Sequence, residues 1–162
     1  MDEQHDSKPK HGALPFDLQR GFTQIPNAVL RHYLYYPKYN GATVAVYGVL
    51  LSHYNAAWGY AYPTHMQVAQ ATNMSLKTVG KHIKTLEGVG LIVVNKGGKF
   101  GNDTYMFNAP IERADDFYAK YPEAGERWRK FSGMLASDKT ERDIRKPAKV
   151  VAEEPDIDDI VW

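Results

Sequence analysis

Cysteine is absent from this 162-residue sequence, and so is any apolar run long enough to cross a bilayer. Without cysteine the chain can form no disulfide and no cysteine-ligated zinc site, which suits a reducing cytoplasm. The most apolar stretch, residues 42–51, is about half as long as a membrane helix. Residues 1–12 lack the apolar core of a signal peptide. The sequence therefore predicts a cytoplasmic protein that has no contact with membranes.

Residue patterns that carry catalysis are also missing. The six histidines have no spacing typical of a metal site, and no serine, histidine and aspartate combine in a catalytic arrangement. The glycines at residues 97–101 are not followed by the Lys-Ser or Lys-Thr pair of a phosphate-binding loop. We therefore expect a protein that is not an enzyme and that holds neither a cofactor nor a metal ion.

Charge is nearly balanced over the whole chain, with a formal net charge of +1, but the balance hides two regions of opposite sign. Residues 64–101 contain five lysines and one glutamate, and no arginine occurs between residues 64 and 108. Residues 137–162 contain eight acidic and five basic residues. The sequence thus predicts a compact basic patch and an acidic tail.

A helix that is apolar on one side and cationic on the other is predicted for residues 75–87. Its apolar residues recur every three or four positions and form one stripe: Leu76, Val79, Ile83 and Leu86. The other side carries Lys77, Thr78, Lys81, Lys84 and Thr85. Ser75 is placed to cap the first turn. His82 lies at the edge of the stripe, where we expect a packed, hydrogen-bonded side chain rather than a metal ligand.

A shorter helix is predicted just before it, at residues 64–72, with Thr64 as its cap. Its residues available for the interior are Met66, Val68 and Ala69. Asn73 follows, and asparagine tolerates the left-handed backbone conformation that a tight turn needs. A helix, a three-residue turn and a capped basic helix have the spacing of a helix-turn-helix.

A β-hairpin is predicted to come next, with strands at residues 91–94 and 104–107. Its turn, residues 95–103, is rich in glycine and carries Lys96 and Lys99. The sequence SLKTVGKHIKTLEGVGLIVV resembles the winged helix-turn-helix proteins, in which a recognition helix enters the major groove and the wing lies along the backbone. This resemblance implies a mainly α fold with a small β wing of two or three strands.

The same resemblance implies that double-stranded DNA is the partner. The residues it places nearest the bases are Ser75, Lys77, Thr78 and Lys81, and those it places at phosphates are Lys84, Lys96 and Lys99. The phrase RGFTQIPNAVLRH, residues 20–32, resembles the entry to winged-helix domains of phage and plasmid replication proteins, including the DnaD-like N-terminal type. That resemblance implies replication initiation or replisome organisation for a mobile element, in the bacterial cytosol or nucleoid. A transcriptional regulator with the same DNA-binding surface remains an alternative.

Four regions are expected along the chain: a disordered arm at 1–21, a winged helix-turn-helix domain at 22–109, a helical extension at 110–136 and a flexible acidic tail at 137–162. Within the domain, further helices are predicted at residues 27–35 and 42–57. The extension should contain helices at 114–121 and 123–136, separated by Pro122. Winged-helix proteins often dimerise through added helices, and by that analogy we expect a homodimer.

The end of the tail, EEPDIDDIVW, resembles the acidic tip of bacterial single-stranded-DNA-binding proteins. The resemblance implies a replication or repair protein bound through Asp156, Asp158, Asp159, Ile160 and Trp162. A solubilising tail that screens the basic face is the alternative, and an adaptor that uses both the winged helix and the tail is another.

Aromatic residues could stack on unpaired bases, but core packing is the expected role of Trp58, Trp128 and the tyrosines. Tyr105, in the predicted second strand of the wing, is the tyrosine whose exposure would most favour stacking.

Overall fold

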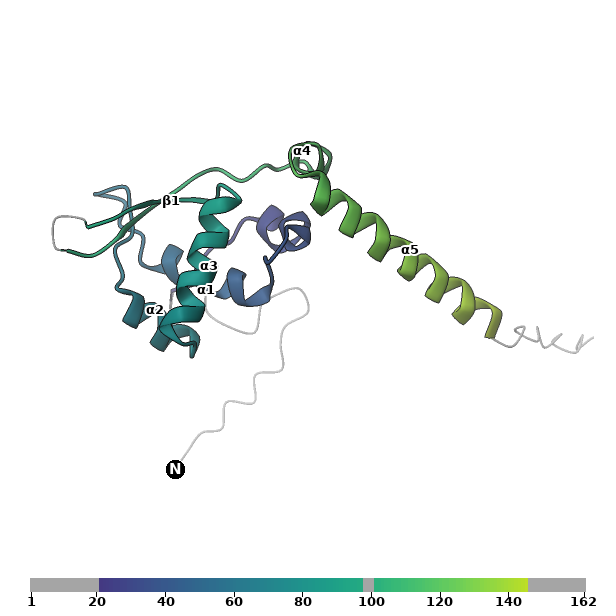
Figure 1. Cartoon of the computed structure of the whole chain (residues 1–162), viewed down its shortest axis with the longest axis horizontal. Coiled ribbons are helices and arrows are strands. Elements are labelled where there is room, and N and C mark those ends of the chain that lie inside the picture. The colour runs from purple at the N-terminus through teal and green to yellow at the C-terminus, as the bar shows by residue number, and fades with distance from the viewer. Residues whose placement is uncertain (1–20, 98–100, 146–162) are drawn as a thin grey trace, which may run out of the picture. The chain divides into compact units, whose positions relative to one another are not determined.

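The computed structural model describes residues 21–97 and 101–145 (Figure 1). These residues fall into two compact units, which meet in the sequence between Gly125 and Glu126. The elements of the first unit run in the order η2 (Asn27–Leu30), η3 (His32–Tyr35), α1 (Gly41–Ser52), α2 (His65–Thr72), α3 (Leu76–Gly88), β1 (Ile92–Asn95), β2 (Thr104–Phe107) and α4 (Ala114–Lys120). Helix α5 (Pro122–Arg145) begins in the first unit and makes up the described part of the second.

Side-chain caps fix where three helices begin. Asn40 accepts hydrogen bonds from two N–H groups in the first turn of α1, at 2.9 and 3.2 Å. Before α2, Thr64 and Gln67 each accept from the other's backbone N–H, at 3.1 and 2.8 Å. Ser75 accepts from the N–H of Thr78 at 3.2 Å and so caps α3. A cap of this kind contributes about 1 kcal/mol. The caps predicted at Thr64 and Ser75 are confirmed.

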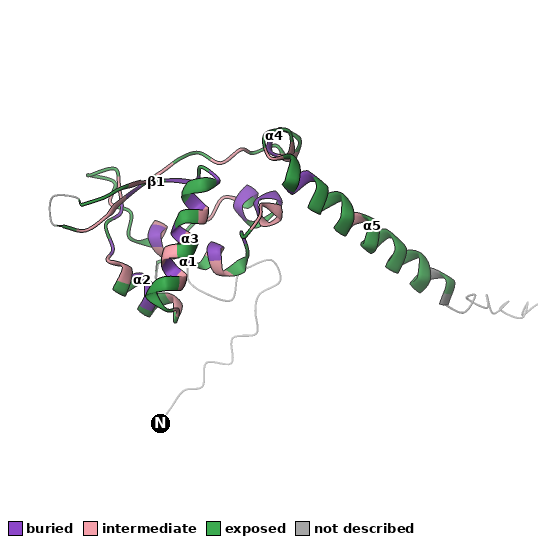
Figure 2. Ribbon diagram, in the orientation of Figure 1, coloured by how far each residue is buried: buried purple, intermediate pink, exposed green. Residues whose placement is uncertain are grey.

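The apolar face of α3 forms a large part of the core, together with α1 and α2. Helix α1 contacts both of the other two. The buried residues of α3 are Val79, Ile83 and Leu86, and those that α1 and α2 contribute include Val46, Leu50 and Val68. Full burial of one such side chain contributes about 1.5–3 kcal/mol. Figure 2 shows that α3 is buried along this side and exposed along the other.

The two strands form an antiparallel hairpin in which Ile92 pairs with Phe107 and Asn95 with Thr104. A third piece of chain extends this sheet, because Ala61 exchanges two backbone hydrogen bonds with Tyr105, at 2.9 and 2.8 Å. The predicted wing of two or three strands is therefore present. The side chain of Tyr105, in β2, is completely buried. The Tyr105 ring is therefore not available to stack on a base.

Residues on either side of the helix-turn-helix meet around Ile111. The imidazole Nε2 of His32 donates to the Ile111 carbonyl at 2.7 Å, and the Ile111 N–H donates to the hydroxyl of Tyr33 at 2.9 Å. The ring of Phe117 lies 4.3 Å from that of Tyr33, centroid to centroid. All three rings are buried. The segments before and after the helix-turn-helix thus belong to one core, which we call the Ile111 clamp.

Several predicted elements differ from those observed. Residues 27–35 form two short 3₁₀ helices, because the backbone of Arg31 (φ −122°, ψ −102°) interrupts them. Helix α1 ends at Ser52 rather than at residue 57, and residues 55–60 form a turn. Leu76 and Met66 were expected inside, yet they are 47% and 62% exposed. Periodicity assigns a residue to a face of a helix, but each of these two lies in the first turn, where that face is not covered.

The helical extension is longer than predicted. Two helices with a break beside Pro122 are confirmed, but the break lies at Tyr121, and Pro122 is the first residue of α5, a position that proline tolerates well. The helix continues to Arg145, so residues 137–145, expected in the flexible tail, are helical. Beyond Gly125 its described side chains are exposed, apart from the half-buried Ser132 (Figure 2). None of the described helices combines the length and the apolar character that a membrane span requires.

Leu86→Ala should lower the free energy of unfolding by about 2–5 kcal/mol, because it leaves a cavity where a fully buried side chain packs. The matched change Leu76→Ala, on the exposed first turn of the same helix, should alter it by less than about 0.5 kcal/mol. Urea unfolding followed by circular dichroism measures both. Equal losses in the two variants would contradict the inward face assigned to α3.

Candidate nucleic-acid interface

Three lysines form a row on the solvent side of α3. Lys77, Lys81 and Lys84 are four and three residues apart, which places them on one face of the helix. All three are exposed, and the buried stripe lies on the opposite side. Within the described residues none of them takes part in an ion pair. Their charges therefore point to solvent without an acidic partner, as predicted from the sequence.

The turn between α2 and α3 sets the angle at which this row is presented. Asn73 has the left-handed conformation expected of it (φ 53°, ψ 42°). The N–H of Met74 donates to the Ala69 carbonyl at 3.0 Å and closes the turn. The hydroxyls of Ser75 and Thr78 lie 2.9 Å apart at the start of α3. These two predicted contact residues are thus placed beside the lysine row and also hold its first turn.

A fourth predicted contact residue, Lys96, lies on the surface of the wing, where it forms an ion pair. The ammonium of Lys96 lies 3.3 Å from the Asp103 carboxylate, and the Lys96 side chain is 79% exposed. His65 Nε2 approaches the same carboxylate at 3.5 Å. The sequence carries a signal for this pair, because an acid placed across a hairpin from a lysine favours pairing. Exposed pairs of this kind are weak, so Lys96 can still turn to a phosphate.

Other predicted contact residues lie outside the described part of the chain. These are Lys99 in the wing and, in the tail, Asp156, Asp158, Asp159, Ile160 and Trp162.

His82 connects α3 to α1. Its Nδ1 lies 2.9 Å from the hydroxyl of Thr43, which is itself buried. Burial lowers the pKa of the imidazole, and the charge of nearby Lys81 lowers it further. The expectation of a packed, hydrogen-bonded histidine is confirmed. The contact also fixes how α3 is rotated about its axis, and with it the direction of the lysine row.

Core packing was expected for the aromatic residues, but some of them lie at the surface. Trp58 is 49% exposed and lies beside the rings of Tyr60 and Tyr62, with centroid distances of 5.9 and 5.1 Å. Trp128 on α5 is 37% exposed. The expectation of core packing was wrong for both tryptophans, and a turn at residues 55–60 carries Trp58 to the surface.

Residues 40–92 match the sequence model of a family described as a helix-turn-helix domain. The match runs from the cap of α1 through α2 and α3 to the first residue of β1. It supports DNA binding by this part of the chain. No curated protein and no solved structure matches the chain significantly.

Acidification should weaken the fold through His82. The folded state lowers the pKa of this imidazole below its ordinary value of 6.5, so the unfolded chain binds the proton more readily. The contribution of His82 to the free energy of unfolding is complete above pH about 6.5 and is lost as the pH falls through the pKa of the folded state. Between about pH 7.5 and pH 5, His82→Gln should therefore lose less unfolding free energy than the parent chain. Urea unfolding across this range is the measurement, and an unchanged pH dependence in the variant would contradict the assignment.

Proposed function

We propose that this protein binds double-stranded DNA through α3 and the wing, without catalysing a reaction. The observation that carries the proposal is the row of Lys77, Lys81 and Lys84 on the solvent side of a capped helix whose other side is buried. The row lies within the segment that matches the helix-turn-helix family. In a helix-turn-helix this helix is the one that enters the major groove.

The dimensions of the row suit that groove. Lys84 lies seven positions after Lys77, which corresponds to about 10 Å along the helix axis. The major groove of B-DNA is about 12 Å wide, so the row can reach base edges at one end and backbone at the other. Ser75, Lys77, Thr78 and Lys81 are proposed nearest the bases, and Lys84, Lys96 and Lys99 at phosphates. Because lysine is less directional than arginine, we expect modest sequence specificity.

Replication initiation or replisome organisation of a phage, plasmid or other mobile element is the cellular role we propose. Its support is the resemblance of residues 20–32 to the entry of winged-helix domains in replication proteins of that kind. A transcriptional regulator would use the same surface. Selection of bound sites from genomic DNA separates the two: an array of repeats near an origin favours replication, whereas a palindrome over a promoter favours regulation.

A homodimer is the proposed assembly, with α5 contributing to the contact. Met134 and Leu135 are 62% and 53% exposed on this helix, and Phe131, one turn earlier, is 47% exposed. Residues three and four apart share a helix face, so these side chains form an apolar patch. Burial of such a patch against its copy would remove it from water.

Duplex binding should depend steeply on salt and on the lysine row. If the charges of all five lysines on α3 and the wing displace counterions from the duplex, log K against log salt should have a slope near −4 to −5 for each chain. Lys77→Met with Lys84→Met should weaken binding about tenfold or more and reduce the slope by about one to two. Fluorescence anisotropy with a mixed-sequence duplex measures both quantities.

The matched control removes the same charge from α5, by Lys130→Met with Lys139→Met, both at exposed positions. This pair should leave affinity and slope nearly unchanged. If the control lowered the slope as much as the row variant, the assignment of the DNA-binding face would be wrong.

Leu135→Glu should shift the protein from dimer to monomer, because it would place a charge in the apolar contact. Ser137→Glu adds the same charge at another position of α5 and should leave the dimer intact. Sedimentation velocity at several concentrations gives the molecular mass in solution. A parent chain that is monomeric throughout would sink the proposal.

A further inference from the structure

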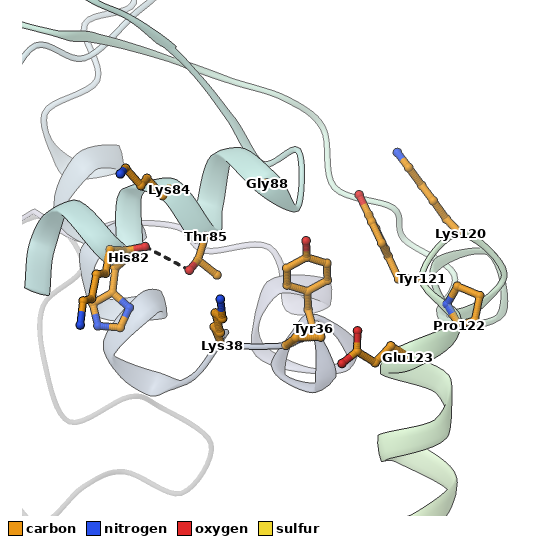
Figure 3. A pocket seen from close by; sticks show the side chains of 12 residues that line it. Tyr36, Lys38, His82, Lys84, Thr85, Gly88, Lys120, Tyr121, Pro122 and Glu123 are labelled. Carbon is orange, nitrogen blue, oxygen red and sulfur yellow. Dashed lines mark hydrogen bonds between the residues drawn. The ribbon is translucent and has the colours of Figure 1, made fainter.

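A pocket of about 840 Å³ lies beside α3, on the flank next to the lysine row. Its walls come from three separate pieces of chain: residues 36–38, the second half of α3 and residues 120–123 (Figure 3). All of these precede Gly125 and belong to the first unit. The volume lies within the usual range for small-molecule sites. Two lysines of the row, Lys81 and Lys84, line the pocket, whereas Lys77 does not.

The lining has a strongly cationic part. It includes four lysines, namely Lys38, Lys81, Lys84 and Lys120, and one acid, Glu123. Figure 3 shows that the side chain of Lys38 extends from its segment toward α3, with its ammonium directed at the helix. Thr85 also lines the pocket, and its hydroxyl, which donates to the Lys81 carbonyl at 3.1 Å, can accept a hydrogen bond from a ligand. Several lysines around one cavity favour a ligand with more than one negative charge.

Apart from His82 and Gly88, the rest of the lining is aromatic and apolar. The rings of Tyr36 and Tyr121 meet edge to face, with centroids 5.1 Å apart. Tyr121 is held in place by its hydroxyl, which donates to the Val89 carbonyl at 3.2 Å. Pro37 and Pro122 add apolar surface. The charged backbone of a duplex gains little from contact with an apolar surface, whereas a planar base packs well on aromatic rings.

Lys38 has a backbone conformation that its residue type disfavours. Its φ is 65°, in the left-handed region, where glycine or asparagine is usual. Among the described residues the other non-glycine with positive φ is Asn73, which suits its turn. Strain of this kind clusters at functional sites. A glycine at position 38 would relieve the strain but could not offer an ammonium group to the pocket.

We propose that this pocket binds a nucleotide, with its phosphates held by the four lysines and its base against Tyr36 and Tyr121. Glu123 accepts hydrogen bonds from hydroxyl or amino groups of the ligand. The nucleotide is either free or part of an unpaired strand, since both present the same phosphate and base. This function goes beyond duplex binding and does not require it.

Isothermal titration calorimetry of the full chain tests the proposal, with ATP, tripolyphosphate, adenosine and a single strand of about six nucleotides as probes. ATP should bind at least about tenfold more tightly than tripolyphosphate, and adenosine weakly. Binding of the short strand without ATP would assign the pocket to unpaired strands, and binding of ATP alone to free nucleotides. If neither bound, or if tripolyphosphate equalled ATP, the proposal would be overturned.

Two variants connect binding to the pocket. Lys38→Gly and Lys120→Met should each weaken nucleotide binding about tenfold. Lys38→Gly should do so without lowering the melting temperature, which excludes unfolding as the cause. Lys77→Met is the matched control outside the pocket and should leave nucleotide binding unchanged. It should weaken duplex binding, whereas Lys38→Gly should not, so the two functions fail separately. Nucleotide binding that is unaffected by Lys38→Gly and Lys120→Met would place the ligand elsewhere.

Discussion

Burial of one face of α3 against α1 is the interaction on which the rest of the structure depends. Val79, Ile83 and Leu86 each contribute about 1.5–3 kcal/mol when buried, while the exposed pair of Lys96 and Asp103 contributes about 0–1 kcal/mol. Apolar contacts therefore decide how α3 lies, and the charges on its other face follow from that choice. The hydrogen bond between His82 and Thr43 then removes the remaining freedom of rotation. The lysine row and the pocket beside it are both consequences of this packing.

Local chemistry made the helix-turn-helix predictable from the sequence. A cap at Ser75, a left-handed turn at Asn73 and an apolar period of three to four each depend on residues close together in the chain. The wing was predictable for the same reason, because glycines mark its turn. The lysine row could be placed on the solvent side as soon as the buried stripe was known. Local sequence patterns no longer predict the structure where contacts between distant segments determine it.

The remaining features depend on contacts between segments far apart in the sequence. Leu76 follows the apolar period but lies at an end of α3 that nothing covers. Trp58 was expected to pack in the core, yet the turn after α1 carries its ring to the surface. Nothing in the neighbourhood of Lys38 in the sequence predicts its left-handed backbone or its place beside α3. The pocket could not be predicted at all, because residues 36–38, 81–88 and 120–123 meet only in the folded chain.

The Ile111 clamp bears on how the chain folds as it is made. His32 and Tyr33 reach Ile111 across 79 and 78 residues of sequence, whereas α2, its turn, α3 and the hairpin pair with near neighbours. Closing a longer loop costs more conformational entropy than closing a short one, and contacts at long range slow folding. The helix-turn-helix can therefore fold early, before η3 packs against the segment around Ile111. During synthesis the core cannot be completed until Phe117 has left the ribosome, well after the recognition helix has emerged.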